Sequence, residues 1–305
     1  MTQTFIGKFD AVVAGRQSNL CVGLDPDFEK VRAAMRPLIL KKLGSEPLYF
    51  GFVSNDPAQS AEPRNVSVEQ LADEPDLAKE AACELIMGAT LAFAAAFKPN
   101  AAFFELAVAS GTGVPQILQQ FADPVLSIFD GKRGDIGNTS EQYARAIFHD
   151  HGYDAVTVNP LMGYDAVEPF LRDPAHGVFL LCLTSNPGAA DFLLKNEMYK
   201  RIAEKAVEWN KAGNVGLVVG ATRPEYAAAV REIAPEVPLL IPGVGAQGGS
   251  LKETLDAIGG RGNRRFLINA SRSIMFPTVP EGQDHLFAVA NAARTLRDEI
   301  NAALA

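Results

Sequence analysis

The segment "PVLSIFDGKRGDIGNTS", residues 124–140, begins with an apolar run and then gathers charged side chains. Its "VLSIF" is apolar enough to form a strand that is covered on both faces. Asp130, Lys132, Arg133 and Asp135 follow within six residues, and the chain continues as "TSEQYARAIFHDHG", which has helical periodicity. The segment therefore predicts one β-α unit in which a buried strand ends in two acids and two bases.

Seven further apolar runs have the same character, and most of them precede a stretch of helical periodicity. They are "NLCVGLDP", "AFAAAFKP", "DAVTVNP", "GVFLLCLTS", "VGLVVGA", "PLLIPGVGA" and "RFLINASR". Eight near-continuous apolar strands with helices between them favour a closed parallel barrel over an open sheet, because both faces of each strand must be covered. We predict an α/β protein with a single (β/α)8 TIM barrel over residues 1–305. A doubly wound sheet is the alternative, although the first predicted strand is not followed by the dinucleotide-binding motif G-x-G-x-x-G and no P-loop motif occurs.

One region interrupts this alternation of strands and helices. The stretch at about residues 38–70, "LILKKLGSEPLYFGFVSNDPAQSAEPRNVSVEQ", is rich in Pro, Ser and Asn and reads as an insertion loop in the first β-α connection. Its "LYFGFV" is a candidate for an extra short strand. Long loops of this kind often act as binding lids or subunit contacts, and the alternative is a disordered or merely decorative surface loop.

Composition limits the classes of partner. The chain has 305 residues and a formal net charge of -8, so no diffuse basic field attracts nucleic acid or an anionic membrane. Cys21, Cys83 and Cys182 are odd in number and widely spaced, which favours packing residues in a reducing compartment. No signal peptide or uninterrupted apolar span of about 18 residues is evident, so we expect a cytoplasmic protein.

Polar side chains end most of the predicted strands, and active sites of such barrels form at the C-terminal strand ends. These candidates are Asp25, Lys98, Asp130, Lys132, Thr184, Ser185, Gln247 and Arg272. The two-residue period of a strand places Asp130 and Lys132 on the same face, with Gly131 leaving the other face bare. Lys98 ends the preceding strand, and Asp135 follows Gly134, so we predict an alternating array of Lys98, Asp130, Lys132 and Asp135.

Two interpretations of that array remain. Buried charges need partners in any protein, so a structural ion-pair cluster is possible. An apolar core of similar volume is usually at least as stable, which favours chemistry at four charges gathered at one strand end.

A second candidate site is the loop "IPGVGAQGGS", residues 241–250, after the seventh strand. Its glycines are expected to expose backbone N–H groups where barrels of this kind often hold phosphate, and Arg272 supplies a bidentate charge. A plain tight turn is the alternative. The histidines show no metal-binding spacing, and "TSNPG", residues 184–188, offers hydroxyl and amide groups for a planar polar ring as well as a helix start.

Five segments, in this order, resemble the orotidine 5'-phosphate decarboxylase family, particularly its longer bacterial branch. They are "LCVGLDPD" at 20–27, "FKPNAAFFE" at 97–105, "DGKRGDIGNT" at 130–139, "TSNPGA" at 184–189 and "PGVGAQGG" at 242–249. The resemblance spans nearly the whole chain, and the family's D-x-K-x-x-D signature matches Asp130, Lys132 and Asp135. The insertion departs from the family pattern but displaces none of the motif residues.

The resemblance implies a role for each candidate. Lys132 is expected to protonate C6 after carbon dioxide leaves, with Lys98, Asp130 and Asp135 completing the catalytic array. Substrate contacts are implied for Asp25 at the ribose, for Thr184 and Ser185 at the pyrimidine, and for Gly245, Gln247 and Arg272 at the phosphate. Asp135 and Thr139 are expected to reach the partner's site across a homodimer.

The implied activity is the decarboxylation of orotidine 5'-monophosphate to uridine 5'-monophosphate (UMP), the last step of de novo pyrimidine nucleotide synthesis. The family requires no metal, flavin or pyridoxal phosphate, so no cofactor is expected. Two rivals remain, which are a magnesium-dependent sugar-phosphate decarboxylase or aldolase of the same barrel type and a non-catalytic nucleotide-binding protein.

Overall fold

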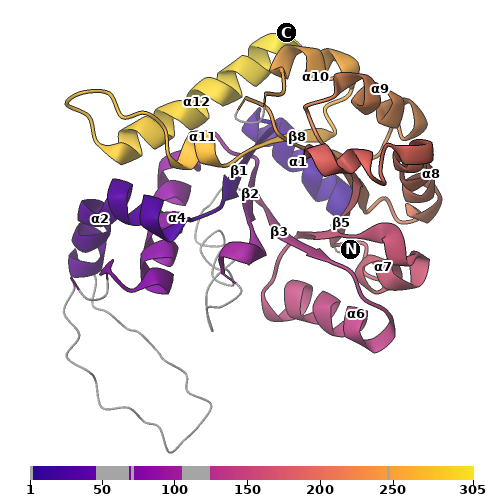
Figure 1. Ribbon diagram of the computed structural model, residues 1–305, viewed down its shortest axis with the longest axis horizontal. Helices are drawn as coiled ribbons and strands as arrows, with labels where there is room; N and C mark the ends of the chain where they lie inside the picture. The colour runs from indigo at the N-terminus through magenta and orange to yellow at the C-terminus, as the bar shows by residue number, and fades with distance from the viewer. Residues whose placement is uncertain (1–2, 46–68, 70–71, 105–123, 246–247) are drawn as a thin grey trace, which may run out of the picture.

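Eight parallel strands close into a barrel in chain order in the computed structural model, which describes residues 3–45, 69, 72–104, 124–245 and 248–305 (Figure 1). The strands are β1 (Leu20–Leu24), β2 (Ala96–Pro99), β3 (Leu126–Arg133), β4 (Ala155–Val158), β5 (Gly177–Leu183), β6 (Val215–Val219), β7 (Leu239–Pro242) and β8 (Phe266–Ala270). Strand β8 pairs with β1, where Cys21 lies opposite Asn269, and this pairing completes the barrel. The predicted (β/α)8 fold is confirmed, and each of the eight apolar runs contains one strand.

Helices surround the barrel (Figure 1). They are α1 (Phe5–Arg16), α2 (Phe28–Ser45), α4 (Pro75–Thr90), α6 (Gly137–Arg145), α7 (Tyr164–Leu171), α8 (Met198–Trp209), α9 (Pro224–Ile233), α10 (Leu251–Ala257), α11 (Arg272–Met275) and α12 (His285–Leu304). A π-helical turn, Ala146–Asp150, extends α6. Within the described residues, none of the helices is long and apolar enough to cross a bilayer.

The strands divide their side chains between two cores. Leu20, Val22 and Leu24 of β1 pack in the large cluster between the barrel and the helices, whereas Cys21 belongs to the cluster inside the barrel. Ala96 and Ile128 also belong to the inner cluster. Because side chains alternate along a strand, the inward positions that follow these two are Lys98 and Asp130. The period of the strands therefore delivers the charged residues to the interior at the C-terminal end.

Helix α1 closes the opposite end of the barrel. Its Phe5 and Phe9 are fully buried in the inner cluster, and the Phe5 ring meets Phe179 of β5 edge-on with 6.0 Å between centroids. Gly177 lies against Phe5, since a Cβ atom there would lie 2.4 Å from Phe5 Cε1. The apolar seal at this end leaves the C-terminal strand ends as the entrance to the interior.

The predicted insertion begins inside a helix. Helix α2 continues through Pro37 to Ser45, so residues 38–45 are helical rather than part of a loop. Residues 46–68 and 70, including the candidate strand "LYFGFV", lie outside the described residues, and for them the insertion stays a prediction. The three cysteines are free and buried, as the packing interpretation expects, and burial raises the pKa of Cys182 to about 12.

The contact between Gly177 and Phe5 makes a testable prediction for stability. We expect Gly177→Ala to lower the free energy of unfolding by about 1–3 kcal/mol, because the added methyl group displaces the ring that seals the barrel. Urea unfolding followed by circular dichroism measures the change. The control is Gly88→Ala in α4, where a Cβ atom meets nothing within 4 Å and the substitution is expected to be neutral or stabilising. Equal stability of the two variants would contradict the role of the seal.

Candidate active site

The charged residues of β2 and β3 meet at a single carboxylate. Lys98 Nζ donates to Asp130 Oδ2, and Lys132 Nζ lies 2.7 Å from Asp130 Oδ1. Lys98 is the third residue of β2, and Asp130 lies near the C-terminal end of β3. The structure therefore gathers three of the four residues of the predicted array within one chain.

Burial and charge together fix the ionisation of the inner pair. Lys98 and Asp130 are 5% and 8% exposed. Burial acts to raise the pKa of Asp130, but the ammonium groups of Lys98 and Lys132 outweigh it and hold that pKa well below its ordinary value. Burial lowers the pKa of Lys98, and the charges of Asp130 and Asp25 outweigh burial, so the pKa lies above its ordinary value. Both groups are therefore ionised at neutral pH.

Lys132 leaves the regular strand geometry. Its φ of +47° lies in the left-handed region, and the pairing of β3 with β4 shifts register between Phe129 and Arg133. A left-handed conformation costs a non-glycine residue about 1–2 kcal/mol. The sequence predicted a regular pleat in which Gly131 left its other face bare, but a Cβ atom on Gly131 would lie 2.5 Å from Phe129 Cε1, so the ring fills that space.

Thr157 of β4 holds this distorted segment and was missed by the sequence analysis. Its Oγ1 accepts the backbone N–H of Lys132 at 3.0 Å and donates to Asp130 Oδ1 at 2.9 Å. The side chain is 1% exposed. The one available signal was its place two residues after Ala155, which faces the barrel interior.

The fourth member of the array stands apart within this chain. Asp135 Oδ1 accepts the backbone N–H of Ile136 at 2.8 Å, and in the described part of the chain Asp135 forms no ion pair with Lys132. Thr139 is exposed on α6. Both residues therefore lie on the segment that follows β3, outside the cluster around Asp130.

A cavity of about 170 Å³ lies above the barrel interior and brings together four predicted residues, Asp25, Lys98, Asp130 and Arg272. Asp25 Oδ1 is buried and has no hydrogen-bond partner. Arg272 is exposed as the first residue of α11. The same cavity is lined by Pro242, Gly243, Val244, Asn269, Ala270, Ser271 and Ser273. It combines two cationic and two anionic side chains in a small volume.

Three backbone N–H groups of the glycine loop after β7 form hydrogen bonds within the loop itself. The N–H groups of Gly245, Gly248 and Gly249 donate to the carbonyl oxygens of Gly249, Gly245 and Gly243. Gly245 has a φ of +69° and is exposed. The expectation of free N–H groups at these three glycines is wrong for this structure, because the turn uses them itself. Gln247 lies outside the described residues.

Thr184 and Ser185 follow β5 and are half-buried. Thr184 Oγ1 donates to Asn186 Oδ1 at 2.6 Å, and the backbone of Ser185 packs against Gly220, where a Cβ atom would lie 2.9 Å from Ser185 Cα. Neither residue lines the 170 Å³ cavity. Both residues therefore lie at the C-terminal end of β5, and neither contacts the cluster of Lys98, Asp130 and Lys132.

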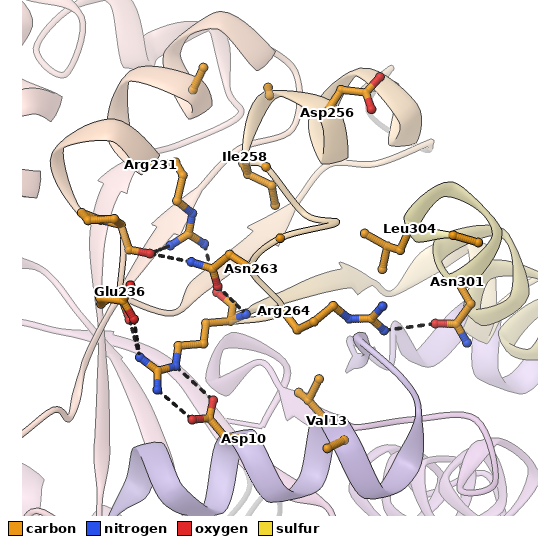
Figure 2. A pocket seen from close by; sticks show the side chains of 18 of the residues that line it. Asp10, Val13, Arg231, Glu236, Asp256, Ile258, Asn263, Arg264, Asn301 and Leu304 are labelled. Carbon is orange, nitrogen blue, oxygen red and sulfur yellow. Dashed lines mark hydrogen bonds and ion pairs between the residues drawn. The ribbon is translucent and has the colours of Figure 1, made fainter.

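A larger cavity of about 1200 Å³ is lined by none of the predicted residues that the structure describes (Figure 2). Its arginines serve the fold, since Arg265 pairs with Asp10 at 2.8 Å and with Glu236 at 2.9 Å. Arg231 donates to the carbonyl oxygens of Ala234, Pro235 and Val237. These contacts hold the segments that precede β7 and β8 against α9 and α1, whereas four of the predicted charged residues line the smaller cavity.

Known proteins are similar to this chain over most of its length. The model of the orotidine 5'-phosphate decarboxylase / HUMPS family matches residues 18–279. Orotidine 5'-phosphate decarboxylase of Roseiflexus castenholzii is 39% identical over 307 residues, with 98% of each chain covered, and that of a Janthinobacterium species is 37% identical over the same length and coverage. The solved structure of Leishmania donovani OMP decarboxylase superposes with a TM-score of 0.71 at 33% identity, covering 99% of this chain and 98% of that one.

These matches extend over nearly the full length of the chain, as expected for the longer branch of the family. The superposition agrees with the closed barrel. The chain therefore belongs to the orotidine 5'-phosphate decarboxylase family.

Proposed function

We propose that the cluster of Lys98, Asp130 and Lys132 carries out the decarboxylation of orotidine 5'-monophosphate to UMP, the activity that family membership assigns to this chain. The observation that supports the proposal most directly is the bridging of two ammonium groups by one carboxylate at the strand ends. Lys132 is the proton donor, and the reaction needs no cofactor.

The chemistry requires a fixed cation beside C6. Loss of carbon dioxide breaks the bond between C6 and the carboxylate carbon and leaves the electron pair on C6, where no adjacent carbonyl group absorbs it. An ammonium group stabilises a charge that appears only in the transition state, and this raises the rate rather than substrate affinity. Lys132 then transfers one proton to C6 to give UMP, and its neutral amine regains a proton from water.

The two lysines have different roles because the exposure of their side chains differs. The side chain of Lys132 is 50% exposed, whereas that of Lys98 is 6% exposed. Lys98 fixes the Asp130 carboxylate from below, and Asp130 in turn directs the Lys132 ammonium group. Lys132 is thus the member of the cluster that reaches the substrate.

The remaining predicted residues are proposed to bind the substrate. Asp25 contacts the ribose, and Thr184 and Ser185 contact the pyrimidine. Arg272, with Gln247 and the segment around Gly245, binds the phosphate. Arg272 supports this assignment, because it stands on the strand end next to the glycine loop and presents an exposed guanidinium group to the cavity.

A homodimer is proposed to complete the site. Four large apolar side chains are exposed on the segments after β3 and β4, namely Ile136, Leu161, Met162 and Tyr164, which are 42–56% exposed. Such exposed apolar groups favour a protein interface. Asp135 and Thr139 lie on the same segment as Ile136, so this interface would carry them to the partner's site.

The full-length relatives favour this function over its rivals. Each of those compared bears the name orotidine 5'-phosphate decarboxylase, which supports decarboxylation over a magnesium-dependent sugar-phosphate reaction or ligand binding alone.

Removal of the proton donor tests the mechanism. We expect Lys132→Ala to lower kcat by at least about 10³-fold, since both the charge at C6 and its proton source are lost. Ultraviolet absorbance of orotidine 5'-monophosphate follows turnover, with and without EDTA. Lys205→Ala, at an exposed lysine of α8, is the control and is expected to keep wild-type turnover. Near-normal turnover by Lys132→Ala would refute the donor, and loss of wild-type activity in EDTA would favour the magnesium-dependent rival.

The depressed pKa of Asp130 predicts a pH-dependent contribution to stability. A carboxyl group whose pKa is lower in the folded state stabilises the fold fully above its unfolded pKa of about 4, and this contribution decreases as the pH falls toward the folded value. We expect Asp130→Asn to cost about 3 kcal/mol at pH 7, because Lys98 loses its buried counter-charge. The difference from wild type should shrink by about 1 kcal/mol at pH 3, as measured by urea unfolding. A difference that is the same at both pH values would contradict the ionised bridge.

Hybrid dimers test the contribution of Asp135 across the interface. Lys132→Ala and Asp135→Ala are each expected to be nearly inactive alone. Coexpression is expected to restore about a quarter of wild-type activity, because half of the dimers are hybrids and each hybrid has one site with both residues intact. The turnover assay, together with sedimentation to verify the dimer, measures the outcome. Absence of recovery in verified hybrids would place Asp135 in its own chain's site.

A further inference from the structure

Two buried oxygen atoms in the small cavity lack hydrogen-bond donors. They are Oδ1 of Asp25 and Oδ1 of Asn269, and both residues line the 170 Å³ cavity with Lys98 and Asp130. A buried acceptor without a partner is destabilising, and most such groups in folded proteins are satisfied. Asp25 has a proposed role at the ribose, whereas Asn269 has had none.

Asn269 occupies an inward position of β8. It follows Leu267 of the inner cluster by two residues, pairs in register with Cys21 of β1 and Pro242 of β7, and is 8% exposed. The corresponding inward positions deeper in the barrel are apolar. A leucine at this place would fill the same space without an unpaired oxygen, so the amide indicates a partner that this structure does not contain.

Gly23 makes room for the Asn269 amide. A Cβ atom on Gly23 would lie 1.9 Å from Ser271 Oγ and 3.2 Å from Asn269 Oδ1. Gly23 pairs in register with Lys98 on its other side. The missing side chain of Gly23 therefore leaves room beside β1 for the Ser271 hydroxyl and the Asn269 amide, both of which line the cavity.

The substrate has few donors to offer. The carboxylate and phosphate of orotidine 5'-monophosphate accept hydrogen bonds, so its donors near neutral pH are the pyrimidine N3–H and the two ribose hydroxyls. The proposed contacts with Thr184 and Ser185 use the N3–H. Two adjacent hydroxyls then remain for two unpaired acceptors in one cavity.

We propose that Asn269 is a substrate-binding residue whose Oδ1 accepts a hydrogen bond from one hydroxyl of the ribose cis-diol, while Asp25 Oδ1 accepts one from the other. The inference rests on the proposed function, because it takes the substrate from there. Its consequence is specificity: the site distinguishes a ribonucleotide from a deoxyribonucleotide through the floor of the barrel.

The test compares three nucleotides by isothermal titration calorimetry. UMP, 2'-deoxy-UMP and 3'-deoxy-UMP are titrated into wild type and Asn269→Leu, which keeps the side-chain volume. Loss of one neutral hydrogen bond is expected to weaken UMP binding by about 3- to 10-fold. For the analogue that lacks the contacted hydroxyl, wild type and variant are expected to bind within about twofold of each other. Asn291→Leu on the exposed face of α12 is the matched control and is expected to leave the three affinities unchanged.

The outcomes separate this inference from the proposed function. Equal UMP affinity in Asn269→Leu and wild type, or an equal loss for all three nucleotides, would overturn the contact even where wild type decarboxylates its substrate. Absence of wild-type turnover together with the hydroxyl-dependent loss would overturn the decarboxylase and keep the nucleotide contact. If circular dichroism shows that Asn269→Leu is unfolded, the three nucleotides are titrated into Asn269→Ser instead. The same affinity changes are expected, and the same results would overturn the contact.

Discussion

The Asp130 carboxylate, held between the ammonium groups of Lys98 and Lys132, is the interaction on which the rest of the site depends. A buried charge without its partners costs several kcal/mol, and replacement of the whole cluster by apolar residues would usually be at least as stable. The cluster therefore needs a rigid framework that offsets its desolvation. The framework is a barrel whose deeper interior is apolar and whose N-terminal end is sealed by Phe5 and Phe9.

Along the barrel axis, the inward-facing side chains change from apolar to polar, because every second residue of a strand faces the interior. Deep inward positions carry Ala96, Ile128, Ala155 and Leu267, which pack in the inner cluster. Two residues further along the same strands stand Lys98, Asp130, Thr157 and Asn269, and all four are buried polar groups. One step along each strand thus changes an apolar core into a layer of buried polar and charged side chains. This change explains why the charged side chains are both shielded from water and accessible to a ligand.

The sequence was sufficient to predict the features that depend on the local pattern of apolar and charged residues. The eight apolar runs each contain a strand, and the meeting of Lys98, Asp130 and Lys132 followed from strand ends that lie side by side. The sequence was insufficient where a distant residue decides the geometry. The positive φ of Lys132 depends on Thr157 of the next strand, and the space beside Gly131 is filled by the Phe129 ring. The glycine loop after β7 satisfies its own N–H groups, and helix α2 passes through Pro37, neither of which composition reveals.

The distortion at Lys132 has a physical reason of its own. In a regular strand, Asp130 and Lys132 would project inward side by side, and a second buried lysine would add desolvation without reaching a substrate. The left-handed turn ends the pleat at that residue, so its ammonium group contacts Asp130 while half of the side chain stays exposed. Thr157 stabilises the turn by bonding to both residues. The local strain therefore separates two chemically identical side chains, with Lys98 fixed as a buried counter-charge and Lys132 left half-exposed at the strand end.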